Sequence, residues 1–344
     1  MADPKGRNVK LRQLRQLRRE RRWRQFRAFR KRRELSCVAN RTATIKPDAV
    51  LVFVTLRNER PRLPYFLRYY RDMGVGHFLF VDNGSEDGSR EYLTAQPDCS
   101  VWTTQASYKS SGFGIDWLNW LLRKYGTGHW TLTLDPDEFF VYPFCDTRPI
   151  NALTDWLDSY EIRSFPAMLL DMYPKGPIDA EPYREGQNPF EIASWFDSGN
   201  YMISKNGKMQ NLWIQGGPRA RCFFPDDPAD APSLNKIPLV KWARGLVYAS
   251  STHMLLPRGL NRVYDEWGGE MISGCLLHAK FLSPWSEKVS EELERRQHYA
   301  NSREYRVYAE TLSEPPDLWC KWSEKYINWR QLEILGLMSK GNWA

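Results

Sequence analysis

The sequence predicts an α/β fold built on a mostly parallel sheet flanked by helices. Apolar runs of strand length alternate with amphipathic helical segments between Ala49 and Val141, and this alternation is typical of parallel sheets with right-handed crossovers. Polar residues follow directly after the strand runs, as in "VTLRNE" and "FVDNGS". The composition does not predict a disordered body, because 42% of the residues of the whole chain are hydrophobic and 14% are aromatic.

The chain begins with a basic arm. From Lys5 to Arg33 there are 15 Arg or Lys residues against one acid, Glu20, so this segment carries a net charge of +14 while the whole chain carries +8. Its apolar side chains recur at steps of about three residues, which predicts a basic amphipathic helix. They are Leu11, Leu14, Leu17, Trp23, Phe26 and Phe29. Such a helix can lie on anionic lipid, pack on its own domain or a second subunit, or bind nucleic-acid phosphates.

The strands and helices that follow place polar side chains at one edge of the sheet. The run "AVLVFVTLRNE" predicts a buried strand, and a helix is expected from Arg62 to Met73, ended by Gly74. The segments "HFLFVD", "CSVWTTQ" and "WTLTL" predict further strands, with "REYLTAQ" and "IDWLNWLLRKYG" as helices between them. Because ligands of such sheets bind beyond the carboxyl ends of the strands, the polar residues at these ends are candidates for a site.

The second half of the chain has a looser pattern. We expect a helix at "INALTDWLDSYE", a strand at "SFPAMLLDMYP", and irregular loops at Pro174–Pro189 and "FFPDDPADAPSLNKIP". The segment "GLVYASSTHMLLP" predicts a strand that bears His253, "GCLLHAKFL" predicts a strand that bears His278 and Lys280, and a charged helix is expected at Ser286–Tyr308. The expected organisation is a helical arm (1–45), a central α/β domain (46–285) and a helical C-terminal extension (286–344).

The cysteines suggest a reducing compartment. The 6 cysteines are scattered, with no CxxC pair or metal-ligand spacing. No apolar run of signal-peptide length begins the chain, and none approaches the roughly 20 residues that span a bilayer. We therefore expect a cytoplasmic protein, soluble or peripheral at the inner face of the plasma membrane, with residues 1–33 as the membrane contact and with no nucleic-acid partner.

The stretch "TLTLDPDEFFV" carries the strongest chemical signal. Asp135 and Asp137 follow a core strand, and both can reach one hard cation because Pro136 turns the chain; Mg²⁺ and Mn²⁺ prefer such oxygen ligands. Alternatively, Asp135 and Glu138 cap a turn or pair with arginines. Asp82 ends an earlier strand, where a carboxylate can bind a base or ribose, but Asp-Asn-Gly is also a favoured turn.

Together, "VTLRNERPRLPYFLRYYRDMGVGHFLFVDNGSEDGS" and "LTLDPDEFF" resemble the family 2 glycosyltransferases of GT-A (Rossmann-like) fold, in the subgroup whose first strand ends in Arg-Asn-Glu and whose metal motif is Asp-x-Asp-Glu-Phe. The resemblance runs from Ala49 to Val141. It implies a nucleotide-sugar donor, with a UDP-sugar expected, and a divalent cation, Mn²⁺ or Mg²⁺. The residues it implies for donor binding are Thr55, Arg57, Asn58, Glu59, Asp82, Asn83, Asp135 and Lys280. The implied metal ligands are Asp135, Asp137 and His278, with His253 as the competing histidine.

The resemblance also implies an inverting transfer to a glycan or lipid-linked acceptor, in cell-envelope or exopolysaccharide biosynthesis. An inverting enzyme needs a carboxylate base on the acceptor side. The family's common Glu-Asp dipeptide is absent, so the candidates are Asp171 in "AMLLDMYP" and Asp197 in "SWFDSGN". Two other classes remain as alternatives. One is a Mg-dependent phosphohydrolase, although such enzymes place Asp-x-Asp on the first strand with a Thr-bearing turn. The other is a nucleic-acid-binding protein that uses the basic arm.

Overall fold

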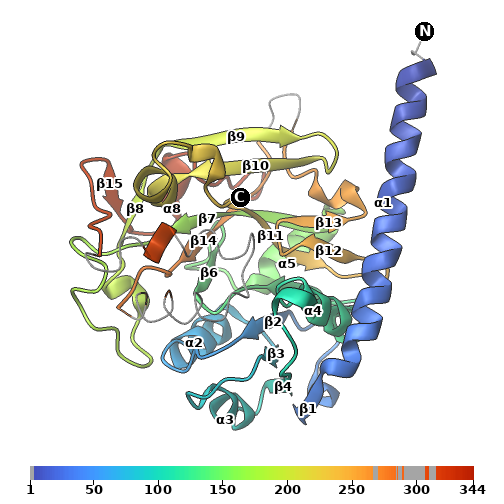
Figure 1. The fold of residues 1–344 in the computed structure, drawn as a ribbon, viewed down its shortest axis with the longest axis horizontal. Helices are drawn as coiled ribbons and strands as arrows, with labels where there is room; N and C mark the ends of the chain where they lie inside the picture. The colour runs from blue at the N-terminus through green and yellow to red at the C-terminus, as the bar shows by residue number, and fades with distance from the viewer. Residues whose placement is uncertain (1–3, 266–269, 284, 286–288, 290–306, 310–314) are drawn as a thin grey trace.

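A large mixed sheet organises the chain (Figure 1). The computed structural model describes residues 4–265, 270–283, 285, 289, 307–309 and 315–344. Within these residues, nine strands form the sheet in the order β1-β4-β3-β2-β5-β11-β7-β14-β6. Their bounds are β1 Ser36–Ala39, β2 Leu51–Leu56, β3 His77–Asp82, β4 Cys99–Thr103, β5 Trp130–Thr133, β6 Glu138–Val141, β7 Ser164–Asp171, β11 Asn235–Lys241 and β14 Gly274–His278.

Most strands of this sheet run in one direction. β4, β3, β2, β5, β7 and β14 are parallel to one another, whereas β1, β11 and β6 run the other way. The expected mostly parallel α/β sheet is therefore confirmed, and the arrangement is compatible with a Rossmann-like fold. The carboxyl ends of the parallel strands and the first residues of β6 and β11 share one edge of the sheet.

Helices cover both faces of the sheet. On β2, Val52 and Val54 point to a core that includes residues of α2 (Leu63–Met73), α5 (Ile150–Ser159) and α8 (Trp329–Ile334). The alternate residues Leu51 and Phe53 point to a second core, formed with α4 (Ile115–Leu121) and β12 (Val247–Ser250). This two-faced burial explains why β2 is a continuous apolar run rather than an alternating one.

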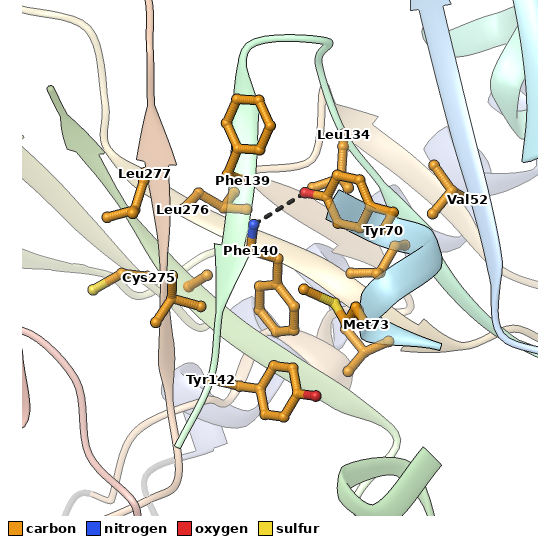
Figure 2. Close-up of a cluster of buried hydrophobic side chains, with 14 of the residues drawn as sticks. Val52, Tyr70, Met73, Leu134, Phe139, Phe140, Tyr142, Cys275, Leu276 and Leu277 are labelled. Carbon is orange, nitrogen blue, oxygen red and sulfur yellow. Dashed lines mark hydrogen bonds between the residues drawn. The ribbon is translucent and has the colours of Figure 1, made fainter. Parts of the chain in front are cut away.

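The aromatic residues that follow the Asp-x-Asp stretch anchor it in the core (Figure 2). Phe139 and Phe140 are buried in β6. The Tyr70 hydroxyl of α2 accepts a hydrogen bond from the Phe140 amide at 3.0 Å and donates one to the Glu138 carbonyl at 2.8 Å. Helix α2 thus fixes the start of β6, and with it the position of the carboxylates just before it.

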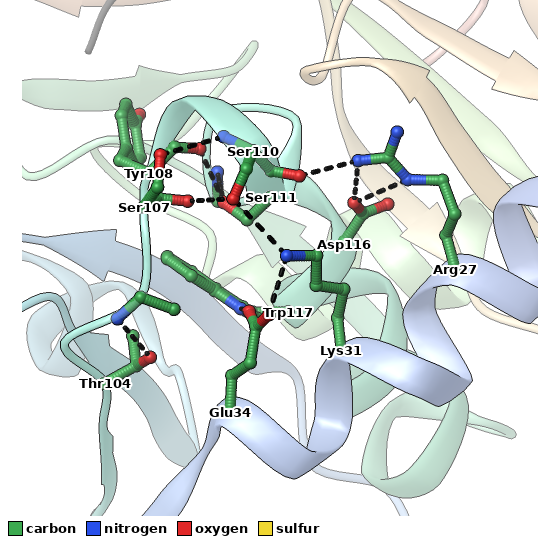
Figure 3. Close-up of polar contacts among 12 residues, drawn as sticks. Arg27, Lys31, Glu34, Thr104, Ser107, Tyr108, Ser110, Ser111, Asp116 and Trp117 are labelled. Atoms are coloured by element: carbon green, nitrogen blue, oxygen red, sulfur yellow. Dashed lines mark hydrogen bonds and ion pairs between the residues drawn. The ribbon is translucent and has the colours of Figure 1, made fainter.

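The basic arm forms one long helix, α1 (Pro4–Lys31), which runs along the side of the molecule and extends past the rest of the chain at its N-terminal end (Figure 1). Arg27 binds Asp116 of α4 through two hydrogen bonds of 3.0 and 2.5 Å. Glu34 accepts hydrogen bonds from Lys31 and from the Trp117 indole (Figure 3). The predicted helix is confirmed, and its C-terminal half packs on its own domain. Among the described residues, no helix is long and apolar enough to cross a membrane.

Smaller elements complete the chain. Within the described residues, the other helix and strands are α3 Ser89–Thr94, β8 Trp195–Asp197, β9 Tyr201–Asn206, β10 Asn211–Gly216, β13 Met254–Leu256 and β15 Ser323–Lys325. Short helical turns occur at η1 Arg32–Glu34, η2 Thr42–Thr44, η3 Lys109–Ser111, η4 Leu122–Gly126, η5 Pro189–Glu191, η6 Arg219–Phe223, η7 Pro228–Asp230 and η8 Arg258–Asn261.

Two local predictions were wrong, and a third falls largely outside the described residues. The end of the expected loop "FFPDDPADAPSLNKIP" is the start of β11. The single strand expected around His253 is a hairpin of β12 and β13, because the chain reverses at Ser251, whose φ is +43°. Most of the helix expected at 286–308 lies beyond the part of the chain that the structure describes.

Candidate functional site

Four of the predicted site residues meet at the carboxyl edge of the sheet. Asp135 follows β5, Asp137 precedes β6, Asp171 ends β7 and His278 ends β14. Strand β14 lies between β7 and β6, in a register that places His278 opposite both Asp171 and Glu138. Sheet pairing therefore brings these side chains together from distant parts of the sequence.

His278 lies between two carboxylates. Its Nδ1 is 2.7 Å from Asp171 Oδ1, and its Nε2 is 3.4 Å from Asp137 Oδ2. Burial alone would lower the pKa of His278, but Asp137 and Asp171 outweigh it and raise that pKa to about 9. The imidazole is therefore protonated at neutral pH while both carboxylates are charged and no cation is bound. The Ala279 amide also donates to the Asp137 carbonyl, at 2.8 Å, which ties β14 to the Asp-x-Asp turn.

Asp171, the first candidate base, is paired on both oxygens. Its Oδ2 accepts from Arg219 Nε at 2.7 Å, while Oδ1 faces His278. Both the aspartate and the arginine are buried. Burial would raise the pKa of Asp171, but Arg219 and His278 together lower it below its usual value. A buried carboxylate held by two cations is better suited to orienting His278 than to meeting an acceptor.

Arg219 was not identified from the sequence. It begins η6, two residues after the pair Gly216–Gly217. A side chain at Gly216 would place its Cβ only 2.2 Å from the Asn200 carbonyl oxygen, so this turn requires glycine. The stretch "QGGPRAR" was therefore the available signal for a tight turn that delivers an arginine.

Asp197, the second candidate base, is also buried and paired. It ends β8 and accepts hydrogen bonds from Arg221, with Nη2 2.9 Å from Oδ1, and from the Tyr173 hydroxyl. Its surroundings join β8 to β15 rather than to the Asp-x-Asp turn. The structure thus does not bring Asp197 together with the other predicted site residues.

A buried lysine supplies the positive charge for the remaining carboxylates. Lys236, near the start of β11, lies 2.7 Å from Glu138 Oε1 and 3.4 Å from Asp135 Oδ2. Glu138 also accepts from the Asp135 amide at 3.2 Å. Burial raises the pKa of Glu138 to about 7 despite the lysine, and the two carboxylates raise the pKa of Lys236 against the effect of burial. The sequence analysis expected Asp135 and Glu138 either to face a metal or to pair with arginines. In the structure their positively charged partner is Lys236.

The signal for Lys236 in the sequence was a lysine directly before the apolar run "IPLV". A charge at a core position is costly unless it is paired. Because the Pro- and Asp-rich stretch before it predicted a loop, Lys236 was assigned to that loop and not to a strand.

A small pocket opens beside Asp135. Its lining includes Thr55 at the end of β2, Thr252 in the β12–β13 turn, and Phe113 before α4. Among the described residues, the hydroxyls of Thr55 and Thr252 are buried and have no hydrogen-bond partner. The Asp135 side chain is 52% exposed. Unpartnered buried hydroxyls beside an exposed carboxylate suit a polar ligand, because each hydroxyl gains a hydrogen bond when the ligand arrives.

The other predicted donor residues on the β3 side connect the loops around this edge. Asp82 is fully buried, and its carboxylate accepts from the Ser85 amide and the Thr103 hydroxyl, each at 3.2 Å. The Asn83 amide donates to the carbonyls of Thr104 and Ala106. The sequence analysis left two roles open for Asp82, a contact to a base or ribose and a turn residue. These contacts match the role in the turn.

The residues after β2 are held in the same way. Arg57 donates to the Asn83 carbonyl at 3.1 Å, and Asn58, with φ of +51°, accepts from the Glu86 amide at 2.9 Å. Glu59 pairs with the buried Arg62 at 3.0 Å. These predicted residues therefore form the loops around this edge of the sheet, whereas Thr55, which lies within β2, lines the pocket.

The two remaining candidates have other contacts. Lys280 places its ammonium 5.0 Å from the centre of the Tyr308 ring. The His253 Nδ1 lies 2.6 Å from the Asn235 carbonyl oxygen, and burial lowers the pKa of His253 to about 4. His253 is thus a neutral, backbone-bonded histidine, whereas His278 faces carboxylates.

The donor set fits a divalent cation only in part. Within the described residues, no group of three or more His, Cys, Asp or Glu side chains is arranged to hold a metal. Asp137 and His278 face each other as a pair, while Asp135 turns to Lys236. Mg²⁺ is commonly held by one or two carboxylates together with substrate phosphates, so a pair of protein ligands is compatible with a site that a phosphorylated substrate completes.

Comparison with known proteins gives no assignment. No protein-family model matches the chain. No curated protein matches it significantly either.

Proposed function

We propose that the protein is a metal-dependent glycosyltransferase that transfers a sugar from a nucleotide-sugar donor to a glycan or lipid-linked acceptor. The observation that supports this most is the contact between Asp137 and His278 at the carboxyl edge of the sheet. Asp135, two residues before Asp137, lines a pocket that also contains the unpartnered hydroxyls of Thr55 and Thr252. Parallel α/β sheets bind ligands at this edge. The residues that resemble the family motif supply the rest of the proposal.

The pocket and the carboxylates would bind different parts of the donor. Thr55 and Thr252 would each form a hydrogen bond with a polar group of the donor, since a pocket of about 60 Å³ is too small for a whole nucleoside. Asp137 with His278 would hold Mn²⁺ or Mg²⁺. Such a cation, when bound, neutralises the charge that develops on a diphosphate leaving group. A UDP-sugar is the proposed donor because of the family resemblance.

Two buried cations prepare this edge for a charged ligand. Arg219 holds Asp171, and Asp171 in turn orients the His278 ring through Nδ1. Lys236 holds Asp135 and Glu138 and adds a fixed positive charge beside the pocket. Preorganised charges of this kind stabilise developing negative charge without reorganising during the reaction. We therefore propose Asp171 as a positioning residue.

The test is a panel of nucleotide sugars with Mn²⁺ or Mg²⁺, in which donor binding is measured by calorimetry and release of nucleoside diphosphate is measured over time. Asp137→Asn should weaken metal-dependent donor binding at least tenfold, because it removes a charged ligand. Asp98→Asn removes an aspartate charge from a partly exposed ion pair with Arg71 and is the control. Absence of binding to every donor would contradict the proposal. Release of inorganic phosphate instead would favour the phosphohydrolase alternative.

A further inference from the structure

A basic groove of about 610 Å³ lies between α1 and the turn after β13, away from the Asp-x-Asp turn. This volume is within the range of about 300–1,000 Å³ seen for small-molecule sites. Helix α1 contributes Arg18, Arg21 and Arg22, which are spaced so that they share one side of the helix, and η8 contributes Arg258. The groove therefore gathers guanidinium groups from two elements far apart in the sequence.

Among the described residues, the groove is not lined by any carboxylate that would balance its charge. The acid of α1, Glu20, pairs instead with Arg24 at 3.0 Å. The Arg21 Nε is buried and has no hydrogen-bond partner among the described residues. The Arg258 Nη1 donates a hydrogen bond to the Lys208 carbonyl, which carries no full charge. Guanidinium groups without a carboxylate partner suit an anion with several oxygens, such as a phosphate group.

The floor of the groove is apolar and fixed. Leu17 is 4% exposed and Leu256 is 1% exposed, and both belong to a buried cluster with Val247. Gln25, further along α1, donates to the Gly245 carbonyl at 2.9 Å. Because these contacts hold the helix against the β12–β13 hairpin, the arginines are placed before any ligand arrives, which favours binding.

The outer surface of α1 combines charge with apolar side chains. Trp23 is 53% exposed, Phe26 is 55% exposed and Leu11 is 46% exposed. Exposed arginines lie between them on the same helix, namely Arg12, Arg15, Arg19 and Arg22. An anionic membrane offers phosphates for the arginines and an interfacial layer for the aromatic rings, whereas a soluble phosphate offers only the first.

We propose that the groove lined by Arg18, Arg21, Arg22 and Arg258 binds the headgroup phosphate of an anionic phospholipid, and that the protein attaches to membranes through this site and the adjoining surface of α1. The ligand is a phosphate diester on a lipid surface. This attachment does not depend on the proposed transfer reaction.

The experiment is co-sedimentation of the full chain with vesicles. One set contains phosphatidylcholine alone, and the other contains equal parts of phosphatidylcholine and phosphatidylglycerol. The protein should bind only the second set, and less tightly as salt is raised. The variant Arg18→Gln/Arg21→Gln/Arg258→Gln should bind about a hundredfold more weakly, since each removed charge near an anionic surface weakens binding roughly fivefold. The control Arg68→Gln/Lys175→Gln/Lys321→Gln removes the same charge from exposed residues elsewhere and should stay within about threefold.

A second variant keeps every arginine. Gly259 lines the groove, and a side chain there would meet no atom within 4 Å, so Gly259→Glu adds a carboxylate to the groove without a clash. It should weaken vesicle binding roughly fivefold, since it changes the charge of the groove by one. Gly199→Glu, at another glycine with open space around it, should not.

Several results would overturn the proposal. Equal binding to both vesicle types would exclude recognition of the anionic headgroup. Loss of binding in the arginine variant but full binding by Gly259→Glu would show that charge acts diffusely and that the groove is not the site. Binding to an oligonucleotide with no binding to anionic vesicles would assign the surface to nucleic acid instead. Circular dichroism of each variant checks that it is folded.

Discussion

His278 and Glu138 should each make the folded state less stable as the pH rises, in separate ranges of pH. The pKa of His278 is raised from 6.5 to about 9 in the folded protein. A difference of this size corresponds to about 3 kcal/mol of folding free energy, at roughly 1.4 kcal/mol for each pKa unit. Because the folded state holds the proton more tightly, this stability is fully present below pH 6.5 and is lost as the pH rises through about 9.

Glu138 acts in the same direction at lower pH. Burial raises its pKa from 4.5 to about 7, so its protonated form is favoured by folding. Stability of a similar size, about 3 kcal/mol, is present below pH 4.5 and is lost as the pH rises through about 7. The two residues therefore act in adjacent ranges, which allows variants to separate them.

The assay is urea unfolding at a series of pH values, with a chelator present so that no divalent cation competes with the proton. His278→Gln should flatten the pH dependence of the free energy of unfolding between about pH 6.5 and 9. Because the His278 charge also lowers the pKa of Glu138, this variant should move the loss of stability due to Glu138 to higher pH without removing it. Glu138→Gln should flatten the pH dependence between about pH 4.5 and 7. His253→Gln is the control, because the pKa of that histidine is lowered to about 4 and it is neutral throughout the upper range.

One outcome would refute this reasoning. If the unfolding free energies of the wild type and His278→Gln run parallel between about pH 6.5 and 9, the carboxylates of Asp137 and Asp171 do not hold a proton on the imidazole. Agreement would have a further use, because a cation that binds at His278 must displace that proton, so its affinity should rise with pH over the same range.

Three further changes follow from other contacts. Arg27→Met leaves the buried Asp116 carboxylate without its partner and should lower stability by about 1–2 kcal/mol, less than a fully buried pair because the Arg27 side chain is 31% exposed; a lower melting temperature is the readout. Thr252→Val keeps the shape but removes an unpartnered hydroxyl, so the melting temperature should not fall, whereas calorimetry should show nucleotide binding weakened by about 1 kcal/mol. Phe140→Ala in the core should lower the free energy of unfolding by about 3–5 kcal/mol in urea titrations, and Phe26→Ala on the exposed helix surface should leave it within about 0.5 kcal/mol.

The sequence was sufficient for the parts of the fold that depend on local pattern. Strand β2 is predicted because both of its faces are buried, so that the run is apolar throughout, and α1 is predicted from its repeated apolar residues. Asp135 and Asp137 were correctly expected just after a core strand, now β5, whereas His278 was expected inside a strand and is instead the last residue of β14; parallel strands bring such ends to one edge.

The parts that could not be predicted depend on contacts between distant segments. Lys236 and Arg219 lie on strands and turns whose partners are set by sheet order, and no local pattern connects them to Glu138 or Asp171. The reversal at Ser251 was missed because neither Gly nor Asn marks its left-handed backbone. The change in the proposed role of Asp171, from base to positioning residue, likewise follows from its burial and from two cations that the sequence does not place beside it.

The short strand β13 lies between the groove against α1 and the pocket beside Asp135. Thr252, just before it, lines the pocket beside Asp135, and Leu256, its last residue, lines the groove against α1. Four residues of extended chain span about 13 Å. If α1 shifts on a lipid surface and moves β13 with it, attachment and ligand affinity at the pocket would be thermodynamically linked, and each would change the other by the same factor.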